Sequence, residues 1–132
     1  MYSVVIPLFN KAPYIIKALK SIESQTFNNY EIIVVNDGST DNSLQVLQEY
    51  ISNLKTLNAD LSKKITVINQ KNQGVSCTRN NAVKIAKYPF IAFLDADDWW
   101  EPEYLSEMKS LIEDFPDAGL WSSSYYVVKN NS

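Results

Sequence analysis

Three carboxylates that stand close together, Asp95, Asp97 and Asp98, are the side chains of this chain best suited to chemistry. They follow the apolar run 90–94, which predicts a short strand buried on both faces, as in a parallel sheet covered by helices. If the chain stays extended, Asp95 and Asp97 point to the same side and repel each other. A hard divalent cation with oxygen ligands, Mg2+ or Mn2+, would remove that repulsion and share its coordination shell with substrate phosphates.

A purely structural role for these acids is the alternative interpretation. Carboxylates that follow a strand and precede a helix often cap the helix and favour its dipole, and Asp98 with Glu101 behind it suits that role. A calcium-binding EF-hand loop is disfavoured because its sixth position requires glycine and is Trp100 here. The cluster taken alone leaves a ligand site and a helix cap equally open.

The composition is typical of one globular domain. Of the 132 residues, 45% are hydrophobic and 20% are charged, which excludes a disordered chain. The net charge is −3 and the Lys and Arg residues are scattered, so a nucleic-acid partner is not expected. The chain has no histidine, so any acid–base chemistry has to come from carboxylates.

The cysteine count and the lack of long apolar segments bear on the compartment. Cys77 is the only cysteine, so an internal disulfide is excluded, and we expect this residue to be small and buried. The segment 1–7 lacks the features of a signal peptide, and no apolar run reaches the roughly 20 residues of a membrane span. We therefore expect a soluble, cytoplasmic protein.

Strand-like and helix-like segments alternate along the chain. Apolar, β-branched runs predict strands and apolar stripes predict helices, with a polar, mobile connection over 58–64. In the third helix, Ala82, Val83 and Ala86 are expected to face inward. A final, uncovered strand is expected over 120–128. The other expected strands cover 2–7, 30–35, 65–68 and 90–94, and the expected helices cover about 13–24, 41–54, 76–88 and 102–114.

This alternation predicts an α/β fold, a Rossmann-like doubly wound sheet that is mainly parallel and flanked by helices. The carboxyl ends of parallel strands share one rim, where such folds bind ligands. A polar loop follows each of the first four strands, and loops that converge in this way predict a nucleotide-sized site. No G-x-G-x-x-G follows the first strand and no G-x-x-x-x-G-K-[ST] occurs, which disfavours dinucleotide and P-loop sites.

Individual residues in those loops have both a functional and a structural interpretation. Thr40 or Asp41 is expected to cap the second helix, but Asp37 stands too far ahead of that helix to cap it. Gly74 precedes a helix start, where free amides suit a phosphate, and Arg79 lies within reach of the same ligand. A surface arginine beside a turn glycine is the alternative interpretation of that pair.

The ordered set of motifs resembles family 2 glycosyltransferases of the GT-A fold. The match runs through nearly the whole chain, in order and at suitable spacing, and its last member is a D-x-D motif. The matching segments are 3–10 (SVVIPLFN), 25–27 (QTF), 31–41 (EIIVVNDGSTD), 72–74 (NQG) with Arg79 and Asn80, and 93–98 (FLDADD).

The resemblance implies a domain that binds a nucleotide-diphospho-sugar, most often a UDP-sugar, with Mn2+ or Mg2+ on the diphosphate. The sugar would be transferred with inversion, as by a hexosyltransferase, to a glycan or lipid-linked acceptor in polysaccharide biosynthesis. Asp97 would be the direct metal ligand, and Asp95 would contact the ribose or the hydrated metal. The role of Asp98 stays open between a residue of the site and a helix cap. Asp37 would bind the base, and the nucleotide-binding residues would together be Pro7, Leu8, Phe9, Asn10, Asp37, Gly74, Arg79 and Asp95.

The chain departs from the family after its central acids. Family members supply the catalytic base and most of the acceptor site from a later segment, and Glu113, Asp114 and Asp117 do not match that position. The resemblance therefore implies that residues 1–132 are one donor-binding domain, the N-terminal part of a longer GT-A enzyme that is truncated here, with its base beyond Ser132. That longer enzyme would be cytoplasmic and peripheral at the inner face of the membrane.

Further expectations concern partners and rival functions. The uncovered strand near 122–128 is expected to pair with a second copy and form a homodimer. The alternative function is a non-catalytic module that binds nucleotide sugars or mediates an interaction. A nucleotidyltransferase would also use strand-end acids and a metal, but residues 9–12 lack the glycine-rich, basic loop that holds a triphosphate.

Overall fold

Strands and helices alternate as expected in the computed structural model, which describes residues 1–129. None of the helices in this range combines the length and the apolar character needed to cross a bilayer. The catalytic base expected beyond Ser132 lies outside the described residues. In chain order the elements are β1 (Tyr2–Leu8), α1 (Ile15–Glu23), β2 (Tyr30–Asp37), α2 (Ser43–Leu57), α3 (Ala59–Lys63), β3 (Ile65–Gln70), α4 (Val75–Ile85), β4 (Phe90–Phe93) and α5 (Tyr104–Asp114).

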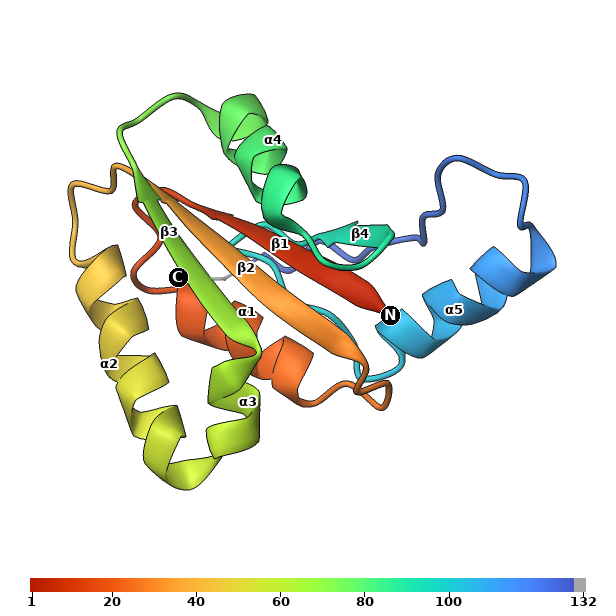
Figure 1. Cartoon of the computed structure of the whole chain (residues 1–132), viewed down its shortest axis with the longest axis horizontal. Helices are drawn as coiled ribbons and strands as arrows, with labels where there is room; N and C mark the ends of the chain where they lie inside the picture. Colours follow the sequence, from red (N-terminus) through yellow and green to blue (C-terminus); the bar gives the residue numbers. More distant parts are fainter. Residues whose placement is uncertain (130–132) are drawn as a thin grey trace.

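The strands form one parallel sheet in the order β3–β2–β1–β4 (Figure 1). The register sets Val4 beside Ile32 and Ala92, and Ile32 beside Ile65. Because the strands all run in the same direction, their carboxyl ends lie at one rim of the sheet. This confirms the predicted α/β fold with a parallel, doubly wound sheet between helices.

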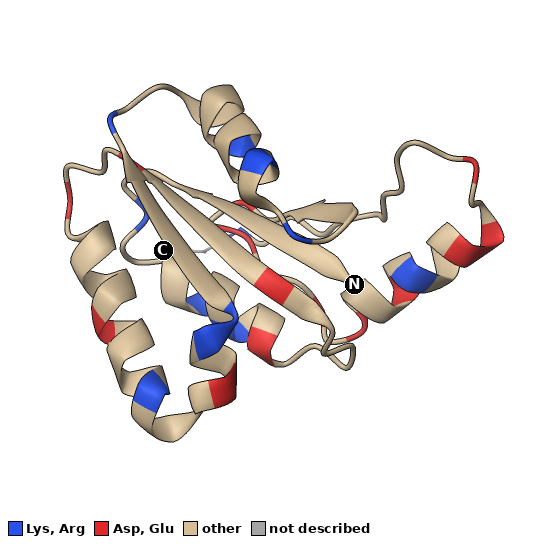
Figure 2. Cartoon of the chain, in the orientation of Figure 1, with Lys and Arg blue, Asp and Glu red and all other residues tan. Residues whose placement is uncertain are grey.

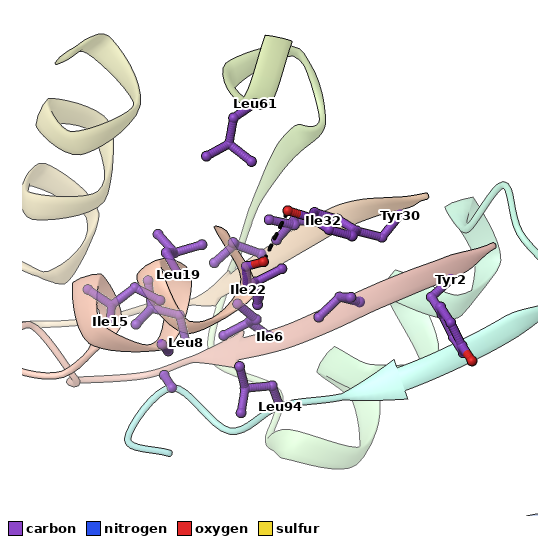
Figure 3. Close-up of a cluster of buried hydrophobic side chains, with 14 of the residues drawn as sticks. Tyr2, Ile6, Leu8, Ile15, Leu19, Ile22, Tyr30, Ile32, Leu61 and Leu94 are labelled. Carbon is purple, nitrogen blue, oxygen red and sulfur yellow. Dashed lines mark hydrogen bonds between the residues drawn. The ribbon is translucent and has the colours of Figure 1, made fainter. Parts of the chain in front are cut away.

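The two faces of the sheet carry hydrophobic cores of different size, because side chains alternate along each strand. On one face Val4, Ile6 and Leu8 are fully buried and pack with residues of α1, α2, α3 and α5. Figure 3 shows Ile6 and Leu8 of β1 beside the side chains of α1. On the other face Val5 packs with Ala82 of α4 in a smaller cluster. Figure 1 shows α4 on one side of the sheet and α1, α2 and α3 on the other. The first face therefore contributes most of the hydrophobic stabilisation.

β4 lies at an edge of the sheet, which corrects the prediction that the run 90–94 is buried on both faces. Phe93, the last residue of β4, is 46% exposed, and the other three residues of the strand are half-buried. Within residues 1–129, β1 is the only strand that pairs with β4. An apolar run indicates a strand, but it does not indicate whether that strand is central or at an edge.

Residues 58–64 contain helix α3, where a polar and mobile connection was predicted. The Asn58 side-chain oxygen accepts a hydrogen bond from the Leu61 backbone N–H at 3.1 Å, which caps the helix. Leu61 is buried in the main core. A cap and one buried leucine thus order a segment whose composition is otherwise polar.

Helix α4 faces the sheet with Ala82, which is fully buried, and Ala86 packs beside it just after the helix ends. The prediction that Val83 also faces inward is wrong, since Val83 is 42% exposed. Adjacent helical residues point about 100° apart, so Ala82 and Val83 cannot face the same sheet equally. Cys77, expected to be buried, is half-buried, and its thiol donates to Gln73 Oε1 at 2.7 Å.

The strand predicted over 120–128 does not form: residues 120–129 contain neither helix nor strand. The Trp121 ring packs against Phe90 with 5.9 Å between centroids, while Tyr125 further on is 85% exposed. A strand satisfies its backbone groups through a neighbouring strand, and none of the strands in the described range pairs with this segment. The segment through which the homodimer was expected to pair is therefore not a strand, and the homodimer itself stays a prediction.

A buried glutamine joins the end of α1 to the segment that leads into α5. Gln25 is 4% exposed, and its Oε1 accepts the Leu105 backbone N–H at 2.9 Å. Its Nε2 donates to the carbonyls of Ser21 at 3.0 Å and Glu101 at 2.7 Å. Helix α5 has no side-chain cap at its first residue, so Gln25 satisfies one of its unpaired N–H groups. Gln25 thereby positions the chain just after the central acids.

We predict that Gln25→Ala lowers the free energy of unfolding by about 2 kcal/mol, because it leaves the buried Leu105 N–H unpaired and removes one of the two hydrogen bonds that the Glu101 carbonyl accepts. Urea denaturation followed by circular dichroism measures this loss, with an unchanged m-value showing that the change is one of stability. Gln48→Ala, at an exposed position of α2, is the control and should cost less than about 0.5 kcal/mol. Equal losses for the two variants would contradict the role of Gln25.

Candidate functional site at the carboxyl ends of the strands

The loops that follow the strands meet at the rim of carboxyl ends. The β1–α1 loop (9–14) lies between the β2–α2 loop (38–42) on one side and the acidic turn (95–98) on the other, because β1 is between β2 and β4. The β3–α4 loop (71–74) follows β3 at the far edge. Figure 2 shows Lys and Arg on several separate elements in this view. The charge of the site is therefore set by individual contacts.

Asn10 joins the β1–α1 loop to the β2–α2 loop. Its Oδ1 accepts the backbone N–H groups of Thr40 at 2.7 Å and Asp41 at 3.1 Å. Its own backbone N–H donates to the Ser39 hydroxyl at 3.1 Å. The φ angle of Asn10 is 51°, in the left-handed region that asparagine tolerates better than most residues. Asn10 thus holds two loops together, and its contact with a nucleotide stays a prediction.

Asp41 binds the first turn of α2 from outside the helix. Its Oδ1 accepts the Ser43 backbone N–H at 2.9 Å and also the Ser43 hydroxyl, and the hydroxyl bond lowers the pKa of Asp41. The N-cap residue is Asn42, whose side chain makes no cap hydrogen bond. The predicted cap at Thr40 or Asp41 is therefore wrong in position, although Asp41 supplies the acceptor that the first helical residue uses.

Asp37 is the buried centre of the β2 side of the rim. This carboxylate is 4% exposed at the last position of β2, and its Oδ1 accepts the Gln73 backbone N–H at 2.8 Å and Gln70 Nε2 at 2.9 Å. Its Oδ2 accepts the Gly74 N–H at 3.0 Å. The Gly74 amide, predicted to be free for a phosphate, is therefore already bound. Asp37 fixes the β3–α4 loop against the end of β2.

Gly38 allows the two loops beside Asp37 to touch. Its φ is 68°, and a Cβ added there would lie 2.7 Å from the Asn72 backbone nitrogen. Asn72 in turn donates through Nδ2 to the Asp37 carbonyl at 3.2 Å. A side chain at position 38 would separate these loops, so glycine is needed for both its backbone angle and its lack of volume.

The acidic residues lie in a turn, so the extended conformation under which Asp95 and Asp97 would point to the same side is not present. The Asp98 backbone N–H donates to the Asp95 carbonyl at 3.0 Å, which closes a β-turn over 95–98. Each of the first two carboxylates has its own cation: Arg79 Nη2 lies 3.0 Å from Asp95 Oδ1. Lys11 Nζ lies 3.2 Å from Asp97 Oδ2. The positive charge that was expected beside the acids is thus supplied by the chain itself, by Lys11 of the β1–α1 loop and Arg79 of α4.

Asp98 does not cap the following helix, which removes one of its two predicted roles. Helix α5 begins at Tyr104 with Glu103 as its N-cap residue, well beyond Asp98. Burial, followed by the neighbouring charges of Asp97 and Asp95, raises the pKa of Asp98. A role of Asp98 in a binding site stays a prediction.

The residues of the acidic turn fit a hard divalent cation. Their donors are carboxylate oxygens, and the side chains of Asp95 and Asp97 are 51% and 44% exposed, so both can be reached. Within residues 1–129, no group of three or more His, Cys, Asp and Glu side chains is arranged to hold a metal ion alone. A cation here would therefore complete its shell with water and with a ligand's oxygens, as Mg2+ usually does.

Arg79 connects α4 to the acidic turn. Its guanidinium lies 5.5 Å from the Phe93 ring centre, and its Nε is buried without a hydrogen-bond partner in the described range. A hollow of about 850 Å3 opens beside the turn, and Arg79, Asp95 and Asp98 are among its walls. Asp37, Gly74 and the 7–10 segment do not line this hollow. The predicted residues thus fall into two groups, one around Asp37 and one around the acidic turn.

Two lysines near the acidic turn were not singled out by the sequence. Lys11 pairs with Asp97, and Lys17 of α1 places its ammonium 3.4 Å from the centre of the Trp99 ring. Lys11 directly follows the matching segment 3–10, and that position is the one sequence signal for it. Lys17 has no such signal, since an exposed lysine on a helix is ordinary.

The fold defines the structural class of the protein, which is the GT-A fold of glycosyltransferases. The S. aureus protein TarS (1–349), solved in complex with UDP-GlcNAc, aligns with a TM-score of 0.73 and 31% identity over 87% of this chain and 32% of the TarS chain. The mannosyltransferase PcManGT from Pyrobaculum calidifontis, in complex with GDP-Man and Mn2+, aligns with a TM-score of 0.73 over 84% of this chain and 32% of its own. Its identity is 22%, so it supports the fold alone.

The chain belongs to glycosyl transferase family 2, because residues 3–132 match the model of that family. The putative glycosyltransferase EpsH of Bacillus subtilis (strain 168) is 41% identical over 106 residues, which make up 80% of this chain and 28% of EpsH. The chain spans less than a third of the length of the curated relatives it matches first. The predicted resemblance is therefore confirmed.

We predict that Gly38→Ala destabilises the domain by about 2 kcal/mol, from the left-handed backbone angle and the close approach of Asn72. Thermal or urea unfolding measures the loss. Gly119→Ala is the matched control, because a Cβ there meets nothing within 4 Å. A Gly38→Ala domain as stable as the Gly119→Ala domain would show that the loops do not need this close approach.

Proposed function

We propose that this domain is the donor-binding part of a metal-dependent, inverting glycosyltransferase that uses a nucleotide-diphospho-sugar, first of all a UDP-sugar. The observation that carries the proposal is the acidic turn at the end of β4, where Asp95 and Asp97 are exposed and each faces a cation. Family membership supports sugar transfer, and the complex of TarS with UDP-GlcNAc supports a UDP-sugar. Family membership also favours an enzyme over a non-catalytic module.

At the acidic turn, Asp97 is the proposed direct ligand of Mn2+ or Mg2+, and Asp95 contacts the ribose or the hydrated metal. Asp98, whose pKa is raised by desolvation and by the neighbouring charges of Asp97 and Asp95, is proposed to add negative charge beside them. When bound, the metal supplies positive charge that stabilises the diphosphate as its bond to the anomeric carbon breaks. Arg79, which already holds Asp95, keeps that carboxylate in place beside the donor.

The nucleoside is proposed to lie between the β1–α1 loop and Asp37. Phe9 is 44% exposed and Pro7 is half-buried, so both side chains can contact a base or ribose. Leu8 is fully buried in the main core, so its part is limited to its backbone. A carboxylate has about four acceptor positions, and Oδ2 of Asp37 accepts just the Gly74 N–H among the described residues. Asp37 Oδ2 is therefore the proposed acceptor for an N–H of the base.

Transfer also requires a base that takes the proton of the acceptor hydroxyl. We place this base beyond Ser132, outside the described residues. The glycan or lipid-linked acceptor, the role in polysaccharide biosynthesis and the cytoplasmic, membrane-peripheral location stay predictions from the sequence. The homodimer also stays a prediction, although the segment 122–128 expected to form it is not a strand.

Titration calorimetry with UDP, UDP-GlcNAc and GDP-Man, each with Mn2+ and with EDTA, tests the proposal. We expect UDP and its sugar to bind in Mn2+ and to lose at least about tenfold in affinity in EDTA. Asp97→Ala should show the weak, EDTA-like affinity even in Mn2+, because the metal loses its direct ligand.

Asp117→Ala is the control for that variant, since it removes one exposed carboxylate at a distance in sequence from the turn. It should bind UDP as the unchanged chain does. The proposal would be overturned if the unchanged chain bound no nucleotide in Mn2+. It would also be overturned if the UDP affinity of Asp97→Ala depended on Mn2+ as strongly as that of the unchanged chain.

A further inference from the structure

The ion pair between Lys11 and Asp97 occupies the carboxylate that is proposed to hold the metal. Lys11 Nζ lies 3.2 Å from Asp97 Oδ2, and the two side chains are 40% and 44% exposed. Exposed ion pairs of this kind add little stability, so separating the pair costs little. A metal at Asp97 would displace the ammonium from this oxygen, because two cations cannot share it without repulsion.

The backbone around Lys11 is held firmly, so the change falls on its side chain. The Lys11 N–H donates to the Ser43 hydroxyl at 2.9 Å, and the Lys11 carbonyl accepts the N–H groups of Tyr14 and Ile15, both at 3.0 Å. Asn10, the residue before it, is bound to the β2–α2 loop. The flexible four-carbon stem of the lysine can therefore swing its ammonium while the loop keeps its place.

The two cations at the acidic turn are not equivalent. Arg79 is anchored, because its guanidinium stacks near Phe93 and its Nε is buried. The Lys11 ammonium is a compact charge whose further contact is the Tyr14 ring at 5.9 Å. Of the two, Lys11 is the cation that can leave its carboxylate and remain within the site.

We propose that Lys11 is a donor-binding residue that exchanges partners, leaving Asp97 when the divalent cation binds and contacting the phosphates of the donor. The inference rests on the proposed function of the same site. The ammonium exchanges a carboxylate for a phosphate oxygen, which is also a charge-assisted hydrogen bond. The incoming metal and diphosphate bring opposite charges of similar size, so the site gains little net charge. Lys11 would thus serve as counter-ion of the empty site and as phosphate ligand of the filled one.

The exchange predicts opposite changes in two binding measurements on Lys11→Ala. With Mn2+ alone, affinity should rise about threefold, because Asp97 is released from its ion pair. With UDP in saturating Mn2+, affinity should fall roughly tenfold, because a charged contact to phosphate is lost. Uridine, which has no phosphate, should bind the variant and the unchanged chain within about twofold of each other.

Lys55→Ala on α2 removes the same charge at an exposed position far along the chain, and it should leave all three affinities unchanged. Lys11→Arg should retain most of the UDP affinity, since it keeps a cation that binds phosphate. Circular dichroism confirms that each variant is folded. Lys11→Gln, which removes the charge but keeps a long polar side chain, should change the affinities as Lys11→Ala does, and it keeps the test decisive if Lys11→Ala does not fold.

The outcomes separate this inference from the proposed function. If the unchanged chain does not bind UDP in Mn2+, the proposed function fails and there is no bound phosphate for Lys11 to contact. If the unchanged chain binds UDP but Lys11→Ala binds it equally well, the Lys11 inference is overturned and the proposed function stands. Weaker binding of Mn2+ alone by Lys11→Ala would also overturn it, because Lys11 would then support the metal site instead of competing for it.

Discussion

Parallel pairing between β1 and β4 is the interaction on which the acidic turn depends. Their ladder runs to Val5 beside Phe93, and it continues one residue further because the Leu94 N–H donates to the Val5 carbonyl at 3.0 Å. Asp95 therefore leaves the sheet at a defined point, next to the β1–α1 loop that follows the same strand β1. The contact of Lys11 with an acid more than eighty residues away in the sequence is a consequence of this pairing.

Three polar side chains, of which Asp37 and Gln25 are buried, complete the rim by joining loops to one another. Asn10 binds the β2–α2 loop, Asp37 binds the β3–α4 loop and Gln25 binds the segment that follows the acidic turn. Unpaired backbone groups at such places are costly, so these side chains fix the loops before any ligand arrives. Several residues of the matching motifs thus build the rim, while the exposed carboxylates Asp95 and Asp97 pair with Arg79 and Lys11.

The hydrophobic pattern of the sequence predicted most elements of the fold. It failed where contacts with distant segments determine whether an element forms and where it lies. The apolar run before Asp95 indicated a strand, but its edge position follows from the strand order. The polar segment 58–64 became a helix through one cap and the burial of Leu61. The aromatic segment 120–129 had the composition of a strand, yet it lacks a neighbouring strand in the described range. Composition expresses local preference, whereas strand pairing requires a partner from elsewhere in the chain.

The sequence by itself determined the α/β class, the rim of polar loops and the family, because periodicity and the order of motifs are local properties of the chain. The tertiary structure alone decided which partner each polar group has. It assigned Arg79 to Asp95 and Lys11 to Asp97, bound the Gly74 amide to Asp37, and separated Asp98 from the start of α5. Such pairings depend on distances between segments far apart in sequence, and only the packing of the strands and helices sets those distances.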